Sequence, residues 1–277
     1  MRISPGLIKQ IVFKNHYCRN GKLAIKKHVN LEYFDRTVNL GDTLSPVICE
    51  WMLNNRTLSF DGKVKKTRHL MALGSILGGS GFFDAVVWGS GIKSFDQISS
   101  LGKRKYIQKL DIRAVRGPLT RDALVACGYS CPAVYGDPAV LMPYIYKPKI
   151  RKIYPTGVIL HYMQNMELPD YIKNIDIRTD NYKCFIDDLC SCEKIISSSL
   201  HGIILAEAYG IPAIFLADGR EFEMVKYYDW YLSSGRRNIK MAFSFEEAMT
   251  MTPLELPDLK SMQESILEAF PYDLWMK

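Results

Sequence analysis

The sequence predicts an α/β protein whose two domains face each other across a cleft, each a parallel sheet covered by helices. Short apolar runs alternate with amphipathic segments along the chain, which is typical of strand–helix units in parallel sheets. A length of 277 residues is enough for two moderate domains. The stretch 142–155 holds three prolines and several basic residues, which indicates a linker or hinge between the two halves.

Apolar runs and helix signals define the expected elements. The segment 118–128 is typical of a helix because Pro118 lies in its first turn and Gly128 follows as a stop signal. We expect residues 1–143 to form one α/β domain and 144–258 a second, with the C-terminal helix in 259–277 as a candidate to complete the first. The expected strands are 70–74, 85–89, 111–116, 133–136, 156–163, 174–179, 193–198 and 212–217, and the expected helices are 42–54, 118–128, 181–191, 200–210 and 259–270.

Composition narrows the functional classes. The seven cysteines are an odd number, scattered along the chain, which favours reduced thiols in a cytoplasmic protein. The first apolar run is interrupted by Lys9, Gln10 and Lys14, so it does not predict a signal peptide or a membrane span. The net charge of +7 favours solubility, an anionic substrate or peripheral contact with an anionic membrane surface. No dense basic stripe predicts nucleic-acid binding, and no ligand cluster predicts a metal site.

Two glycine-containing loops are candidate ligand sites: 39–43 leads into a predicted helix, and 88–92 follows a predicted strand. Ligands of parallel sheets commonly bind in such loops, at the carboxyl ends of the strands. In 39–43 (NLGDT), Gly41 permits a tight backbone, and Asp42 either caps the next helix or aims its carboxylate at substrate hydroxyls. In 88–92 (WGSGI), the backbone around Ser90 and Gly91 either cradles an anion or forms a plain turn.

Arginines in 111–122 (DIRAVRGPLTRD) offer an anion clamp. Arg116 is nearest the carboxyl end of the expected strand and is our candidate, because a guanidinium matches carboxylate and phosphate geometry. We expect Arg113 and Arg121 to form structural ion pairs or to lie on the surface.

The segment 195–210 contains a lone histidine after three serines. We expect Ser197, Ser198 or Ser199 to cap the helix that follows. His201 lies in the first turn, where the positive end of the helix dipole disfavours its charged form unless an anion is bound. It is therefore either an acid–base group whose charge follows ligand binding or a hydrogen-bonded core histidine.

A basic and aromatic segment, 217–237, follows the last expected strand. It is either an amphipathic helix with a solvated face or a wall for a sugar. In the second case the aromatic rings stack on the sugar while basic side chains such as Arg220, Lys226 and Arg236 hold a charged donor.

Six motifs between residues 39 and 237 occur in an order that resembles the polysaccharide pyruvyltransferases, especially the bacterial exopolysaccharide type. The resemblance implies a GT-B-like pair of Rossmann-like domains, with the acceptor on the N-terminal side and the donor on the C-terminal side with His201. It implies transfer of the pyruvyl group of phosphoenolpyruvate to a sugar, giving a cyclic ketal and phosphate. The acceptor would be a polysaccharide or a lipid-linked oligosaccharide at the inner face of the cell membrane, and no cofactor is expected. The motifs are NLGDTLSP, VVWGSGI, DIRAVRGPLTRDAL, VYGDPAVLMP, IISSSLHGIILAEAYGIPA and VKYYDWYLSSGR.

The resemblance makes His201 the candidate acid or donor-binding group and Arg116 a donor clamp, with Asp42 as a further candidate catalytic residue. Many relatives carry an arginine where Ser199 stands, and Arg220, Lys226 and Arg236 are the candidates to replace it. Two other functions stay open: a GT-B nucleotide-sugar glycosyltransferase, in which Glu207 could bind the ribose, and a non-catalytic glycan-binding protein. The candidate binding residues are Asn39, Gly41, Ser90, Gly91, Ser199, Leu200, Arg220, Lys226 and Arg236.

Overall fold

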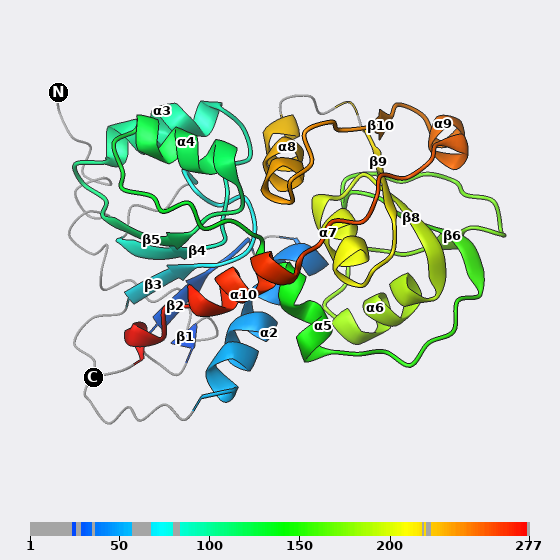
Figure 1. Cartoon of the computed structure of the whole chain (residues 1–277), viewed down its shortest axis with the longest axis horizontal. Helices are drawn as coiled ribbons and strands as arrows, with labels where there is room; N and C mark the ends of the chain where they lie inside the picture. The colour runs from blue at the N-terminus through cyan, green and yellow to red at the C-terminus, as the bar shows by residue number, and fades with distance from the viewer. Residues whose placement is uncertain are drawn as a thin grey trace.

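Two five-stranded sheets organise the chain (Figure 1). The structure, a computed structural model, describes residues 24–25, 29–34, 37–56, 68–79, 84–217, 219 and 223–275. The first sheet has the order β1-β2-β3-β4-β5, and its strands are parallel except for the antiparallel pair β1 and β2. Its strands are β1 (Ala24–Ile25), β2 (Val29–Glu32), β3 (Arg68–Met71), β4 (Ala85–Trp88) and β5 (Leu110–Ala114).

The second sheet is parallel throughout and has the order β7-β6-β8-β9-β10. From β6 the chain moves to β7 on one side, and then to β8 on the other side of β6. Doubly wound sheets commonly bind ligands at such a reversal, beyond the carboxyl ends of the two strands concerned, here β6 and β8. The strands are β6 (Tyr154–Ile159), β7 (Lys173–Asn174), β8 (Cys192–Ser197), β9 (Ala213–Leu216) and β10 (Met241–Ala242).

Helices cover the sheets, and several start as the sequence predicts. Pro118 opens α4, and Gly128, with a φ of +83°, follows its end. The helices are α2 (Leu40–Asn54), α3 (Asp96–Arg104), α4 (Pro118–Ala126), α5 (Met142–Ile145), α6 (Tyr182–Cys190), α7 (Leu200–Ala208), α8 (Met224–Ser233), α9 (Phe245–Thr250), α10 (Lys260–Glu268), and the 3-10 turns η1 (Pro138–Leu141) and η3 (Tyr272–Leu274).

The two halves share one apolar core. Its buried side chains come from both sheets and from the helices α2, α7 and α10. Helix α7 is apolar almost all round, and its residues 200–207 are all buried, as expected for a helix enclosed by protein. At the start of α2, Leu40 N donates a hydrogen bond of 2.8 Å to the carbonyl of Ile177 in the second half. These contacts hold the start of α2 against the second half of the chain.

The C-terminal helix lies against the first sheet. Trp88, at the end of β4, donates its indole N–H to the carbonyl of Ile266 in α10 at 2.8 Å. Its ring meets Phe270 edge to face, with 4.8 Å between the centroids. Helix α10, near the end of the chain, therefore packs against the end of β4, which lies much earlier in the sequence (Figure 1).

The expected α/β class with parallel sheets is confirmed, whereas the cleft, the domain boundaries and the GT-B likeness stay predictions. The expected strand 133–136 is wrong, since this segment makes a single bridge between Tyr135 and Val115. Of the expected strand 174–179 only the start pairs, as part of β7 (Lys173–Asn174). In the described part of the chain, no helix is long and apolar enough to cross a lipid bilayer.

Candidate functional site

The three serines at the end of β8 fold the loop at the carboxyl ends of β6 and β8. Ser197 Oγ contacts two carbonyls, those of Ile159 at 2.8 Å and Ser199 at 2.9 Å, and it accepts the Ser199 N–H at 3.0 Å. Ser198 Oγ accepts the backbone N–H of His161 at 2.9 Å. The loop is thus fixed to the carboxyl end of β6.

Helix α7 begins at this loop without the expected serine cap. Ser199 occupies the N-cap position in an extended conformation, but its side chain makes no capping hydrogen bond in the described structure. The N–H groups of a first helical turn have no partner within the helix. Because no serine satisfies them, the start of α7 keeps its capacity to bind an anion. Leu200, the first helical residue, is buried in the core.

His201 lies in this first turn, enclosed by residues from the other half of the chain. It is 9% exposed. The backbone of Gly41 lies against the ring, so that a Cβ at this position would be only 1.9 Å from His201 Nδ1. The close approach explains the glycine in the NLGDT motif, because a larger residue would displace the imidazole.

Asp137 faces the other side of the imidazole, and the sequence analysis did not single it out. Its Oδ2 lies 3.6 Å from His201 Nε2, and neither atom has a hydrogen-bond partner among the described residues. Its Oδ1 accepts the Ala139 N–H at 3.0 Å and caps η1. The Asp-Pro pair at 137–138 is a helix-start signal, so the cap could have been predicted. Only the tertiary fold brings the second oxygen to His201.

Asp42 completes a group of three titratable side chains. It is the third residue of α2 and not its N-cap, which is Asn39, so the capping interpretation of Asp42 is wrong. Asn39 Nδ2 donates a hydrogen bond of 2.8 Å to Asp42 Oδ2. Burial raises the pKa of Asp42 from 3.8 to about 6, although His201, Asn39 and Lys226 lower it. A carboxyl with this pKa can hold or release a proton near neutral pH.

Of the cations predicted in the basic segment, Lys226 is the one whose charge acts on this group in the described structure. Lys226 is buried, and its charge acts on Asp42. Its Nζ lies 2.6 Å from Glu223 Oε2, while Lys93 reaches the other oxygen of the same carboxylate at 2.6 Å. Burial alone would raise the pKa of Glu223, but the two lysines outweigh it and hold that pKa at about 2. Arg220 lies outside the described residues.

A family model described as polysaccharide pyruvyl transferase matches residues 64–220, which is more than half of the chain. The chain belongs to the polysaccharide pyruvyl transferase family. "Uncharacterized protein L143" of Acanthamoeba polyphaga mimivirus is 30% identical over 224 residues, which cover 75% of each chain.

A solved structure of a functionally uncharacterised protein, KP1_0663 of Klebsiella pneumoniae subsp. pneumoniae NTUH-K2044, has a similar fold. The TM-score is 0.50 and the sequence identity 13%, and the match covers 87% of this chain and 100% of that chain. At this identity the likeness concerns the fold alone.

In this pyruvyl transferase family member, the Arg116 guanidinium is not free to clamp an anion as predicted. Its side chain is 1% exposed and pairs with Asp229 of α8, with 3.3 Å between Nε and Oδ2. It also donates to Ser75 Oγ at 2.7 Å and to the carbonyl of Ile92. The arginine thus ties α8 to the first half, and burial with a fixed partner is the physical reason for the difference.

The predicted anion cradle at 88–92 is also filled by protein. Ser90 Oγ and the Gly91 N–H both bind the carbonyl of Gly74, at 2.9 and 3.1 Å. A Cβ on Gly91 would lie 2.5 Å from the Arg116 guanidinium carbon. In this loop the glycine serves the Arg116 contact, and Ser90 fixes the turn.

Arg236, the last predicted binding cation, is held by Glu207. The two make paired hydrogen bonds of 2.5 and 2.8 Å, and Trp230 donates to the same carboxylate at 2.8 Å. Both ionic side chains are largely buried. This geometry makes them a structural pair that joins α7 to the end of α8. As expected, Arg113 also forms structural ion pairs, with Asp111 and Asp273.

Proposed function

We propose that the protein transfers the pyruvyl group of phosphoenolpyruvate to a sugar of a polysaccharide or lipid-linked oligosaccharide precursor. Two sugar hydroxyls become bridged by a cyclic pyruvate ketal, and phosphate is released. The observation that carries this proposal is the group of Asp42, Asp137 and His201 beside the uncapped start of α7. The family supplies the transferase class.

Asp42 is the proposed acid. Phosphoenolpyruvate must gain a proton on its CH2 carbon, which leaves an oxocarbenium-like centre at C2. A buried carboxyl with a pKa of about 6 retains part of its proton near neutral pH and can supply it. The uncapped N–H groups of α7 then stabilise the anionic donor. Lys226, whose charge already acts on Asp42, is the proposed replacement for the arginine that many relatives carry at the position of Ser199. Its partner Glu223 is also paired with Lys93, so the charge of that carboxylate stays balanced when Lys226 binds the donor.

His201 is the proposed base. It takes the proton of the first sugar hydroxyl as that oxygen bonds to C2, and Asp137 orients the imidazole and stabilises its charged form. The C2–O bond to phosphate then breaks, which forms an oxocarbenium-like centre again; the second hydroxyl bonds to C2, and its proton leaves with the phosphate. The first hydroxyl proton replaces the one that Asp42 delivered to carbon, so the site returns to its starting state.

The nucleotide-sugar glycosyltransferase is less well supported. It needs a carboxylate for the ribose hydroxyls, and the candidate, Glu207, is already bound by Arg236 and Trp230. We also propose that the reaction takes place in the cytoplasm, with peripheral contact at the inner membrane face when the acceptor is lipid-linked. The net charge of +7 would favour that contact.

The test is incubation of the purified protein with phosphoenolpyruvate and a panel of oligosaccharide and lipid-linked acceptors. We expect phosphate release together with a ketal methyl signal in the NMR spectrum of the glycan. His201→Gln should lower kcat by about 100-fold or more, whereas the exposed control Asp170→Asn should keep it. Turnover of a nucleotide sugar without phosphate release from phosphoenolpyruvate would contradict the proposal.

A further inference from the structure

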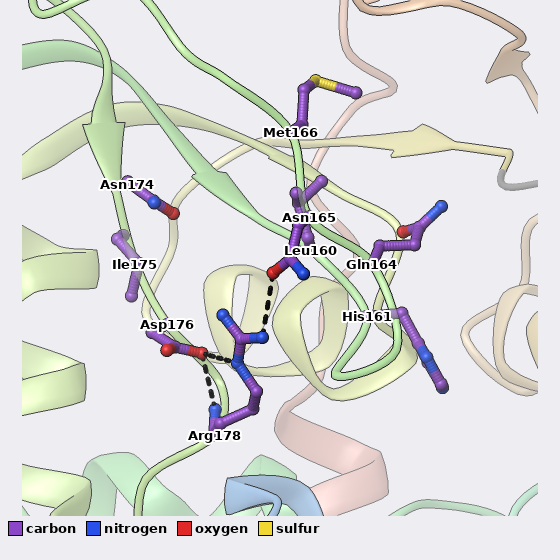
Figure 2. A pocket seen from close by; sticks show the side chains of 9 residues that line it. All are labelled: Leu160, His161, Gln164, Asn165, Met166, Asn174, Ile175, Asp176 and Arg178. Carbon is purple, nitrogen blue, oxygen red and sulfur yellow. Dashed lines mark hydrogen bonds and ion pairs between the residues drawn. The ribbon is translucent and has the colours of Figure 1, made fainter.

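A polar pocket lies at the carboxyl ends of β6 and β7, beside the loop that carries the candidate catalytic group. Figure 2 shows it with Arg178 between Asp176 and Asn165. Its volume is about 60 Å³. That space accepts hydroxyl groups or a hydroxymethyl group, but it is too small for a whole sugar ring. The lining residues are Leu160, His161, Gln164, Asn165, Met166, Asn174, Ile175, Asp176 and Arg178.

The pocket offers both donors and acceptors on half-exposed side chains, with Arg178 43% and Asp176 53% exposed. Arg178 Nε donates to Asp176 Oδ1 and its Nη1 donates to Asn165 Oδ1, each at 2.9 Å. Its other terminal nitrogen, Nη2, makes no hydrogen bond to the described protein, and neither do Asp176 Oδ2 and the Asn174 amide. A guanidinium N–H, an amide and a carboxylate oxygen are thus left for a ligand.

The charge of the pocket favours a neutral ligand. Burial alone would raise the pKa of Asp176, but its hydrogen bonds with Arg178 outweigh this and hold that pKa below the ordinary value. The carboxylate is therefore ionised at neutral pH and balances the guanidinium. A second anion would meet Asp176, whereas sugar hydroxyls can donate to its free oxygen and accept from the arginine.

His161 is the one ring among the lining residues of this pocket, and a series of ring contacts leads from it to the first half of the chain. His161, which lines it, lies against Tyr162 with 4.4 Å between ring centroids. Tyr162 in turn lies 6.5 Å from Phe34, which follows β2 in the first half. Small-molecule sites commonly combine aromatic surfaces with a few placed polar groups. The rings can carry the apolar face of a sugar whose hydroxyl edge enters the pocket.

Two hydrogen bonds of Ser198 join the pocket to the catalytic loop, one from the His161 N–H at 2.9 Å and one to Gln164. Ser198 Oγ donates to Gln164 Oε1 at 2.5 Å, and Ser198 lies three residues before His201. A sugar held by the pocket would therefore lie beside the loop from which the proposed base acts.

We propose that this pocket is a subsite for a neutral sugar of the acceptor glycan, with Arg178, Asp176 and Asn165 binding its hydroxyls. The inference rests on the proposed pyruvyl transfer only in naming that sugar as part of the acceptor. It adds a contribution from the C-terminal half to acceptor binding, which the family resemblance places on the side of residues 1–143.

Arg178→Gln and Asn165→Ala test the subsite, with Arg151→Gln as the matched control. Arg151 is an exposed arginine that precedes β6, on the side of the strands' amino ends, whereas the pocket lies at their carboxyl ends. Loss of a charge-assisted hydrogen bond should raise the acceptor KM about tenfold or more. The KM for phosphoenolpyruvate and the kcat at saturating acceptor should change less than about twofold. Unchanged acceptor KM in both variants, or a rise in the phosphoenolpyruvate KM instead, would overturn the assignment.

Binding without turnover separates this inference from the proposed function. Saturation-transfer NMR would use neutral methyl glycosides of glucose, galactose, mannose and N-acetylglucosamine, with methyl glucuronide as the acidic probe. We expect a neutral glycoside to bind to the wild type and the Arg151→Gln control, and to lose its signal with Arg178→Gln. If no neutral glycoside binds, or if methyl glucuronide binds in preference, the subsite assignment is wrong, whether or not the protein transfers pyruvate.

Discussion

Replacing Asp42 by Asn should stabilise the protein at alkaline pH while it removes the proposed acid. Burial raises the pKa of Asp42 from 3.8 to about 6, a shift of about two units. Each unit corresponds to about 1.4 kcal/mol, so the ionised carboxylate costs about 3 kcal/mol of folding free energy above pH 7. Asn is neutral and similar in shape, and it avoids this cost.

The pH dependence gives the sign of the effect. Between about pH 4 and pH 6 the folded protein binds more protons than the unfolded chain, so the Asp42 contribution to stability falls as the pH rises through this window. The variant should therefore match the wild type at pH 4 and exceed it at pH 8. For a chain of 277 residues the gain corresponds to a Tm increase of about 5 °C.

Thermal unfolding followed by circular dichroism at pH 4, 6 and 8 measures this difference. The exposed residue Asp170 provides the control, since Asp170→Asn should leave the difference between the two pH values unchanged. An Asp42→Asn variant that is less stable than the wild type at pH 8, or equally shifted at pH 4 and pH 8, would refute the reasoning. The same variant should lose most of its pyruvyl transfer.

Three further substitutions test the interpretation of the site. Asp137→Asn keeps the acceptor that caps η1 but removes the charge facing His201, so kcat should fall about 100-fold with little change in Tm, as phosphate-release assays and thermal unfolding would show. Gly41→Ala places a Cβ 1.9 Å from His201 Nδ1 and should lower kcat far more than it raises KM; wild-type kcat would contradict the packing. Arg116→Met leaves the Asp229 carboxylate buried and unpaired, so we expect the free energy of unfolding measured in urea to fall by about 3–5 kcal/mol. An unchanged free energy of unfolding would show that the ion pair contributes little to stability.

Local signals predicted the elements but not their partners. The start of α4 followed from Pro118, and α7 followed from the apolar run after His201. The short pairing of 173–174 and the single bridge at Tyr135 did not follow, because β propensity depends on whether a neighbouring strand is present.

Arg116 and Arg236 show most clearly what cannot be predicted from the sequence, namely the partner of a charged side chain. A guanidinium near a strand end suits an anion and a buried carboxylate equally well. The sequence cannot show that α8 brings Asp229 to Arg116, or that Glu207 faces Arg236 across two helices. Both pairings join residues more than twenty-five positions apart, and only the packing of the helices decides them.

The sequence by itself determined the α/β class, the family and the importance of the NLGDT and SSSLHG segments. Glycines, caps and apolar periodicity are local properties, and they can be predicted from neighbouring residues. The tertiary structure decided the chemistry of the site. It brought Gly41, Asp42, Asp137 and His201 together from three distant segments. It also set the pKa of Asp42, since that value depends on burial and on neighbouring charges that only the folded chain supplies.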